Sequence, residues 1–326
     1  LMRSRSRSKA ELWCVFLFLA VFVTAGAGGA FAQTGQETQV FSVMSANITS
    51  GSFSAYEAPG IRIFQGLSPD VVLVQEFNYA GDLRDLVDEA FGPEFDYYVE
   101  PGGETIPNGI VSRFPIISAG EWADAEVSNR DFAWAVIDIP GDIDLQVVSV
   151  HLTSSSASAR NDEALAIKAN VSSAFDPGHY IVVGGTMNVQ SASEAAMDTF
   201  RTFLAVDTHI PTDQDGNRNT NAARTEPLDW VVPNAALDAN HTTLGVGSDL
   251  FPAGLVFDSR VYPPPLPSPI LLGDSGAAGM QHMPVMKAYE VAIPVPLPGL
   301  GPVGIGGLLG LLGASVYWRL RTGSGW

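Results

Sequence analysis

Six polar residues of the sequence stand at the ends of short apolar runs, where a folded chain would gather them. They are Asn47, Glu76, His151, Asn188, Asp229 and His282. Carboxylate and amide oxygens are ligands for a hard cation such as Mg²⁺, and imidazoles move protons near neutral pH. Taken singly, each of these residues is an ordinary polar strand end, because loops face water. The ordered set is more specific and indicates chemistry at one site.

Short strands and helices must hold these residues in place. Runs rich in Val and Ile, which are typical of strands, recur at residues 71–74, 109–111, 147–150, 181–183 and 230–232. Apolar residues at helical spacing occur at 82–91, 164–174 and 196–204. The five prolines of residues 262–269 predict a surface loop. We therefore expect an α/β layered domain with helices outside the sheets.

Longer phrases surround the six residues in a fixed order. They are Ser45-Ala-Asn47, Pro69-Asp-Val-Val-Leu-Val-Gln-Glu76, Asn108-Gly-Ile-Val-Ser-Arg-Phe-Pro115, Val150-His151-Leu152, Gly184-Gly-Thr-Met-Asn188, Leu228-Asp229-Trp230 and Gln281-His282-Met-Pro-Val285. Over residues 39–291 this order resembles the endonuclease/exonuclease/phosphatase superfamily, the fold of DNase I-like nucleases. The resemblance implies an α+β fold of four layers, a two-sheet β-sandwich flanked by helices. It also implies a metal-dependent phosphoesterase whose active site lies at one end of the sheets.

The same resemblance implies a metal site. Glu76 is its principal carboxylate, Asn47 supports it, and Gln281 stands on the metal side of the last motif. The cation would be Mg²⁺ or Mn²⁺, with Ca²⁺ as an alternative. Such a cation neutralises the negative charge that builds on a phosphodiester when water attacks it.

The catalytic and phosphate-binding roles are implied in the same way. His151 and His282 would donate hydrogen bonds to the phosphate, and Asn47 would contact it from the metal side. Asn188 would orient the phosphate or a water molecule. Asp229 would hold and polarise His282, as an acidic partner fixes an imidazole tautomer.

Two positions depart from the pattern of the superfamily. Thr186 stands where a water-activating Asp is usual, and Gln281 stands where the Asp of an Asp-His pair is usual. Losing a general base typically lowers a rate by about 10²–10⁴-fold. Two residues or pairs could replace the missing base. The Asp229–His282 pair could accept the proton, or the side chain of Asp274 could reach the site. The alternative is a catalytically disabled, surface-displayed binding protein on the same fold.

Composition limits the substrate. The chain has 326 residues, 46% of them apolar, and a formal net charge of −18. This charge argues against a basic groove that grips nucleic acid by neutralising phosphates alone, although metal ions can supply positive charge locally. DNA, RNA, a phospholipid and a small phosphate ester all remain open as substrates, and we expect a phosphodiester, with nucleic acid favoured. We expect a monomer.

Both ends of the chain are typical of targeting segments. Residues 1–32 combine a basic start, the apolar run 12–26 and Ala30-Phe31-Ala32, which predicts a secretory signal peptide. Residues 293–326 combine a Pro-rich motif, the apolar run 299–318 and a basic end. This tail resembles the PEP-CTERM class of bacterial sorting signals, with a plain single-span anchor as the alternative.

These segments predict the domain boundaries and the location of the protein. The phosphoesterase-like domain would occupy residues 33–292. The protein would be exported, held for a time in the inner membrane by the C-terminal helix, and passed by the sorting machinery to the cell surface, the outer envelope or the medium.

Two other motifs imitate functional sites. Gly273-Asp-Ser275-Gly276 imitates the nucleophile motif of trypsin-like proteases, but the chain has no matching His motif, so a loop residue is the better interpretation of Ser275. Residues 213–219 resemble the start of a calcium loop, but Arg224 stands where such a loop needs Glu. We therefore interpret this stretch as a polar turn.

Overall fold

The computed structural model describes residues 37–48, 57–79, 81–101 and 105–293. The predicted signal peptide and C-terminal tail lie outside these residues and stay predictions, as do the domain boundaries that depend on them. Within the described ranges, no helix is both long and apolar enough to cross a membrane.

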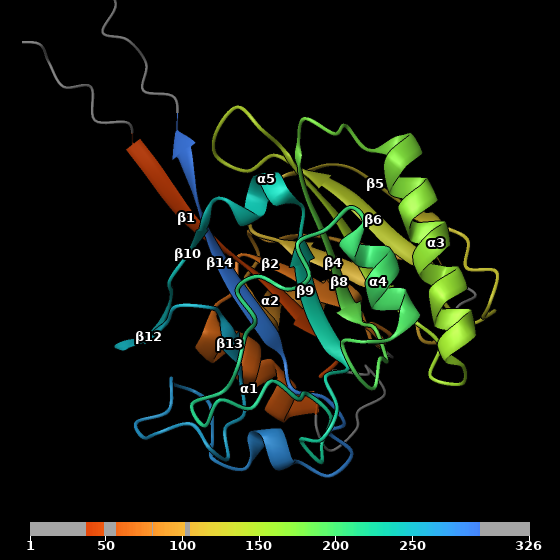
Figure 1. Cartoon of the computed structure of the whole chain (residues 1–326). Coiled ribbons are helices and arrows are strands. Elements are labelled where there is room, and N and C mark those ends of the chain that lie inside the picture. Colours follow the sequence, from red (N-terminus) through yellow and green to blue (C-terminus); the bar gives the residue numbers. More distant parts are fainter. Residues whose placement is uncertain (1–36, 49–56, 80, 102–104, 294–326) are drawn as a thin grey trace, which may run out of the picture. The chain divides into compact units, whose positions relative to one another are not determined.

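Two β-sheets form the centre of the fold (Figure 1). The first has seven strands, and β13 (Leu255–Val256) pairs with β14 beside the main path. In order, the main path runs through β10 (His241–Thr242), β14 (Val285–Ile293), β1 (Glu37–Ala46), β2 (Val71–Val74), β4 (Gly109–Ser112) and β3 (Asp96–Val99). Strand β1 is parallel to β2 and antiparallel to β14, so the carboxyl ends of β1 and β2 meet the amino end of β14.

The second sheet has five strands. Its order is β5 (Ile116–Trp122), β6 (Phe132–Ile137), β7 (Leu145–His151), β8 (Tyr180–Thr186) and β9 (Asp229–Pro233). Strands β7 and β8 are parallel, while β9 is antiparallel to β8. A separate hairpin joins β11 (Leu244–Val246) to β12 (Asp249–Phe251).

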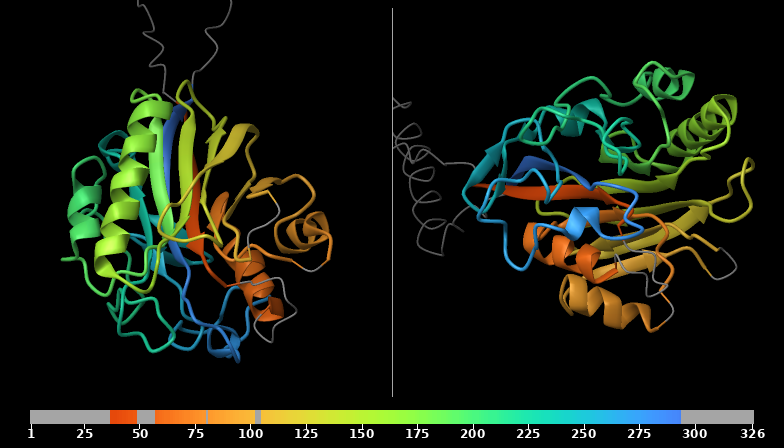
Figure 2. Two further views of the ribbon diagram at one scale, coloured as in Figure 1. Left: turned by 90° about the vertical axis from the view of Figure 1, so that its right-hand side faces the viewer. Right: turned by 90° about the horizontal axis from the view of Figure 1, so that it is seen from below.

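Helices cover the outer faces of both sheets, which gives four layers (Figure 2). The helical elements are α1 (Glu57–Leu67), α2 (Leu83–Ala90), α3 (Ala157–Ala174), α4 (Ala195–Arg201), α5 (Ala235–Asp238) and the 3₁₀ turn η1 (Asp274–Gly276). Helices α1 and α2 lie outside the first sheet, and α3 and α4 lie outside the second. The predicted sandwich flanked by helices is confirmed.

Two apolar cores explain why some strands are apolar along their whole length. Val147 packs in the core that includes the space between the sheets, whereas its neighbour Val148 packs against α3 and α4. Val182 and Val183 of β8 divide in the same way. Successive side chains of a strand point to opposite faces, so a strand buried on both faces becomes a continuous run of Val and Ile.

Capping residues and apolar spacing account for the helices that the sequence predicts, but not for α1. Asp82 caps α2 by accepting a hydrogen bond from the backbone of Arg84, and Ser156 caps α3 in the same way. The structure confirms the helices expected at 82–91, 164–174 and 196–204, although the last ends at Arg201. Helix α1 is absent from the sequence prediction, because Pro59, Gly60 and Gly66 are residues with low helix propensity.

A close approach of β7 and β8 sets up the end of the second sheet. Gly185 has a φ of +142°, and a Cβ placed there would lie 1.9 Å from the carbonyl oxygen of Val150. Only glycine therefore lets the two strands pair immediately before His151 and Thr186, which are paired in register.

We expect Gly185→Ala to lower the free energy of unfolding by about 3 kcal/mol or more, because it adds both a backbone clash and a strained φ. Gly273→Ala is the matched control, since a Cβ there would meet nothing within 4 Å. Urea unfolding of both variants measures the difference. Equal stabilities would contradict the packing described for β7 and β8.

Candidate functional site

The two sheets bring the predicted site residues to one end of the sandwich, the lower end in Figure 1. Asn47 and Glu76 follow the carboxyl ends of β1 and β2, while His282 precedes the amino end of β14. His151 and Thr186 end β7 and β8, whereas Asp229 begins the antiparallel β9. Both sheets therefore contribute to one group of side chains.

The buried carboxylate of Asp229 is the centre of this group. One oxygen, Oδ2, lies 2.9 Å from Nδ1 of His282, and the other, Oδ1, accepts a 2.8 Å hydrogen bond from the hydroxyl of Thr186. The backbone N–H of Asp229 donates to the hydroxyl of Thr220 at 2.9 Å. Both carboxylate oxygens are thus engaged, and the pair formed with His282 joins the second sheet to the first.

The environment of His282 favours its charged form. Burial alone lowers the pKa of His282, but the charge of Asp229, the hydrogen bond to it and the charge of Glu76 together raise it above the ordinary value. Because Nδ1 faces Asp229, Nε2 is the ring nitrogen that remains for another partner.

Asn47 links Glu76 to the same group. Its Nδ2 lies 3.3 Å from Oε1 of Glu76 and 3.3 Å from the hydroxyl of Thr186. Glu76 is half-buried and has a left-handed backbone with a φ of +53°. Asn188 also has a φ of +53°. Non-glycine residues in this region are uncommon and cluster at functional sites, where the surrounding structure holds them.

His151 differs from His282 in its protonation. Burial, followed by the charges of Arg130 and His282, lowers the pKa of His151 well below the ordinary value. Among the described residues, no hydrogen-bond partner meets its buried Nδ1. The site therefore holds one neutral imidazole and one whose charged form is favoured.

The backbone beyond β7 is held by the predicted site residue Asn188 and by two further side chains, Arg130 and Glu163, that the sequence did not single out. Arg130 donates to the carbonyl oxygens of His151 and Leu152, and Asn188 donates to that of Leu152 at 2.7 Å. The amide nitrogen of Asn188, predicted to orient phosphate or water, is thus engaged with the backbone. The carboxylate of Glu163 accepts the N–H of Thr153, and burial raises the pKa of Glu163 to about 8.

Gln281 and Asp274 form no hydrogen bond with the side chains of this group among the residues that the structure describes. Gln281 is exposed, and its backbone carbonyl accepts from the N–H of Ala222 at 2.8 Å. Within the described part of the chain, no hydrogen bond joins the Gln281 side chain to the other site residues. Asp274 directs both of its oxygens to the guanidinium of Arg62 on α1, at 3.0 and 2.6 Å. It is therefore engaged in a structural ion pair.

The donor set fits a metal only in part. Across the residues that the structure describes, no cluster of three or more His, Cys, Asp and Glu side chains is placed to hold an ion. Glu76 has the amide of Asn47 beside it, and Asp229 has both oxygens engaged. Mg²⁺ is commonly bound by one or two carboxylates together with phosphate oxygens of the substrate. Glu76 fits a cation held in this way, whereas an all-protein cage does not fit.

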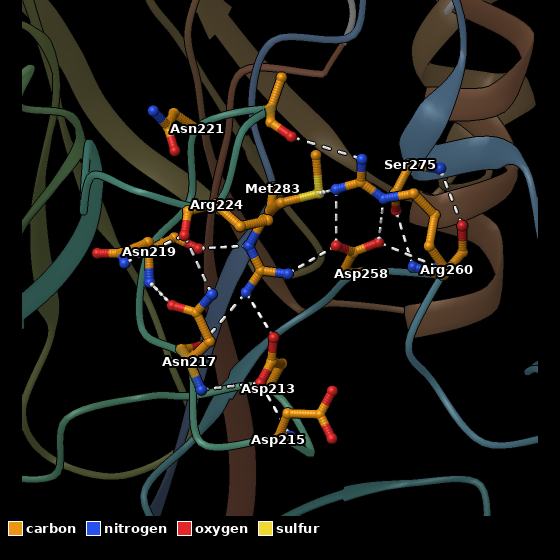
Figure 3. Close-up of polar contacts among 12 residues, drawn as sticks. Asp213, Asp215, Asn217, Asn219, Asn221, Arg224, Asp258, Arg260, Ser275 and Met283 are labelled. Carbon is orange, nitrogen blue, oxygen red and sulfur yellow. Dashed lines mark hydrogen bonds and ion pairs between the residues drawn. The ribbon is translucent and has the colours of Figure 1, made fainter.

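In the loop that resembles a calcium site, the guanidinium of Arg224 occupies the centre (Figure 3). The guanidinium of Arg224 bonds to the carboxylates of Asp213 and Asp258, at 2.6 Å each, and to the backbone carbonyls of Asn217 and Asn219 at 3.3 and 2.6 Å. The stretch is therefore a polar turn, as predicted, but it is closed around an arginine rather than open to water.

This arginine-centred turn supports the site. Thr220 and Asn221 lie on it: Thr220 accepts from the backbone of Asp229, and Asn221 forms a β-bridge with His282. One signal of this arrangement was visible in the sequence: Arg224 stands at the position where a calcium loop needs Glu. Ser275 lies in the 3₁₀ turn η1 rather than in an irregular loop, and it exchanges hydrogen bonds with Ser259, from backbone to hydroxyl in each direction.

Solved structures share this architecture. An endonuclease/exonuclease/phosphatase from Bacteroides vulgatus is 18% identical, with a TM-score of 0.54 over 78% of this chain and 99% of its own. A family protein from Bacteroides thetaiotaomicron is 15% identical (TM-score 0.53, 79% and 100%), and sphingomyelinase C from Streptomyces griseocarneus is also 15% identical (0.51, 77% and 99%). No family model and no curated sequence matches the chain. At these identities the likeness establishes the DNase I-like fold, which the sequence predicted.

We expect Asp229→Asn to lower the pKa of His282 below its ordinary value of 6.5, because burial is then opposed by Glu76 alone. The stability that Asp229 gives through this proton is fully present below about pH 6 and is lost as pH rises through the raised pKa. NMR titration of the imidazole measures the shift. Asp215→Asn, on the exposed part of the turn, is the control. An unchanged titration of His282 would contradict the pairing.

Proposed function

We propose that the protein is an exported, metal-dependent phosphoesterase that hydrolyses phosphodiester bonds. The observation that carries the proposal is the convergence of Glu76, Asn47 and the Asp229–His282 pair at one end of a DNase I-like sandwich. The sequences of the two end segments support export, and their resemblance to a signal peptide and a sorting tail is the basis of the proposed location. The replacements at Thr186 and Gln281 are consistent with reduced activity.

The residues divide the work as follows. Glu76 would hold Mg²⁺ or Mn²⁺, and Ca²⁺ is a further candidate; when bound, the cation neutralises charge on the phosphate. His282, oriented by Asp229, donates from Nε2 to a phosphate oxygen or to the leaving group. In hydrolysis, the oxygen of water forms a bond to phosphorus, the ester P–O bond breaks, and the leaving oxygen takes a proton. His151, which burial keeps neutral, would donate a hydrogen bond from its N–H to a phosphate oxygen, and the proton of the water passes to solvent.

The Glu76→Gln variant tests this function. We expect it to lower turnover of bis-p-nitrophenyl phosphate with Mg²⁺ or Mn²⁺ by about 10²-fold or more, because it removes the charge that holds the cation. Glu126→Gln, an exposed residue, is the control and should leave the rate unchanged. Turnover that persists in Glu76→Gln, or no turnover by the unaltered protein on any phosphodiester, would contradict the proposal.

The second candidate is a surface-displayed binding protein on a disabled enzyme fold. It is favoured by the state of Thr186, whose hydroxyl stands in the usual carboxylate position and is already bonded to Asp229. In this account the site recognises phosphate groups without cleaving them.

Thr186→Asp separates the two candidates. The new carboxylate would face that of Asp229, so we expect a loss of about 1–3 kcal/mol of stability without a cation, and recovery of the melting temperature in Mg²⁺. Thr186→Asn is the matched control and should show no such dependence. Calorimetry and phosphodiester assays provide the readouts. Turnover that appears only in Thr186→Asp favours the binding protein, and comparable turnover in the unaltered protein excludes it.

A further inference from the structure

An apolar turn is exposed on the segment that leads into η1. From Val261 to Gly273 the sequence carries no charged residue, and it contains the five prolines of residues 262–269. The side chains of Leu271 and Leu272 are adjacent and are 57% and 64% exposed. Two neighbouring leucines exposed to this extent form a small apolar protrusion, and we call residues 271–272 the leucine turn.

The leucine turn is held firmly from beneath. Ile270 is buried against α1, where a Cβ on Gly66 would lie 2.5 Å from its side chain. The carbonyl of Leu272 accepts from the hydroxyl of Ser259 at 3.0 Å, and the N–H of Leu271 donates to the carboxylate of Asp274 at 2.8 Å. These bonds fix the backbone of the turn, from which both leucine side chains extend exposed.

The turn lies at the same end of the sandwich as the site. Figure 1 places η1, which follows the turn, at the end where β1 and β8 finish. Arg260, next to Ser259, donates to the backbone carbonyl of Ala222 at 3.5 Å and contacts the sulfur of Met283 at 3.7 Å (Figure 3). Since Met283 directly follows His282, a short chain of contacts joins the leucine turn to the site.

The charges around the leucine turn limit the kind of partner that it can bind. The arginines around the turn are paired with carboxylates: Arg62 with Asp274, Arg224 with Asp213 and Asp258, and Arg260 with Asp258. Nucleic acid binding depends on cations that neutralise phosphates, and the chain carries a net charge of −18. A zwitterionic lipid surface needs no such cations, because exposed leucines bind it by burying apolar area.

We propose that the leucine turn docks the protein on a zwitterionic phospholipid surface and presents the headgroup phosphodiester to the site formed by Glu76 and His282. This inference rests on the proposed phosphodiesterase function and names its substrate class as a phospholipid rather than nucleic acid. Docking through two aliphatic side chains fits a reversible, peripheral contact, since lasting attachment needs a second anchoring signal.

A fluorescent label at the turn tests the docking directly. In the full chain carrying Cys14→Ser, the variant Leu272→Cys receives an environment-sensitive label. With phosphatidylcholine vesicles we expect a blue-shifted emission that brominated acyl chains quench. Leu165→Cys, on the outer helix α3 and 48% exposed, is the matched control and should not respond. No response at position 272, or an equal response at 165, overturns the proposal.

Kinetics separate docking from chemistry. We expect the double variant Leu271→Ser/Leu272→Ser to lower turnover of phosphatidylcholine vesicles by about tenfold while turnover of bis-p-nitrophenyl phosphate is unchanged. An equal loss on both substrates, or binding of plasmid DNA with no response to vesicles, overturns the docking. The unaltered protein could instead form a dimer that the double variant abolishes, with no response to vesicles. That result would make the turn a subunit interface and would also overturn the docking proposal. No turnover of the soluble ester by the unaltered protein contradicts the phosphodiesterase function, while the label still reports on docking.

Discussion

The carboxylate of Asp229 is the interaction on which the site depends. It belongs to the second sheet, yet it bonds to the imidazole of His282, which leads into the first sheet, and to the hydroxyl of Thr186 on the neighbouring strand. A buried carboxylate is stable only when its oxygens are satisfied, so both partners are needed. Asp229 therefore holds His282 and Thr186 together at this end of the sandwich.

This arrangement gives Thr186 a defined physical role. A carboxylate at position 186 would repel Asp229 unless a cation lay between them, whereas a hydroxyl can donate to it directly. Asp229 is thereby engaged with Thr186 and His282, and Glu76 is a further carboxylate of the same group, beside Asn47. Such a site is suited to a cation that arrives together with phosphate oxygens.

Much of the fold could be predicted, and so could the gathering of polar side chains at the strand ends, because both follow local rules. Buried strands such as residues 147–150 and 181–183 are apolar throughout, and polar residues must follow where such strands end. Long-range bonds could not be predicted in this way. No sequence pattern shows that Arg224 joins Asp213 to Asp258, that Arg62 engages Asp274, or that Thr186 donates to Asp229, because each partner is distant in the chain.

The central claim is that Asp229 couples the two sheets through His282, and a double-mutant cycle measures this coupling directly. The free energies of unfolding of Asp229→Asn, His282→Asn and the double variant should give an interaction energy of about 1–3 kcal/mol at pH 6. The interaction energy should decrease as pH rises through the raised pKa of His282, because the imidazole then loses its charge. Additivity within about 0.5 kcal/mol at pH 6 would contradict the account.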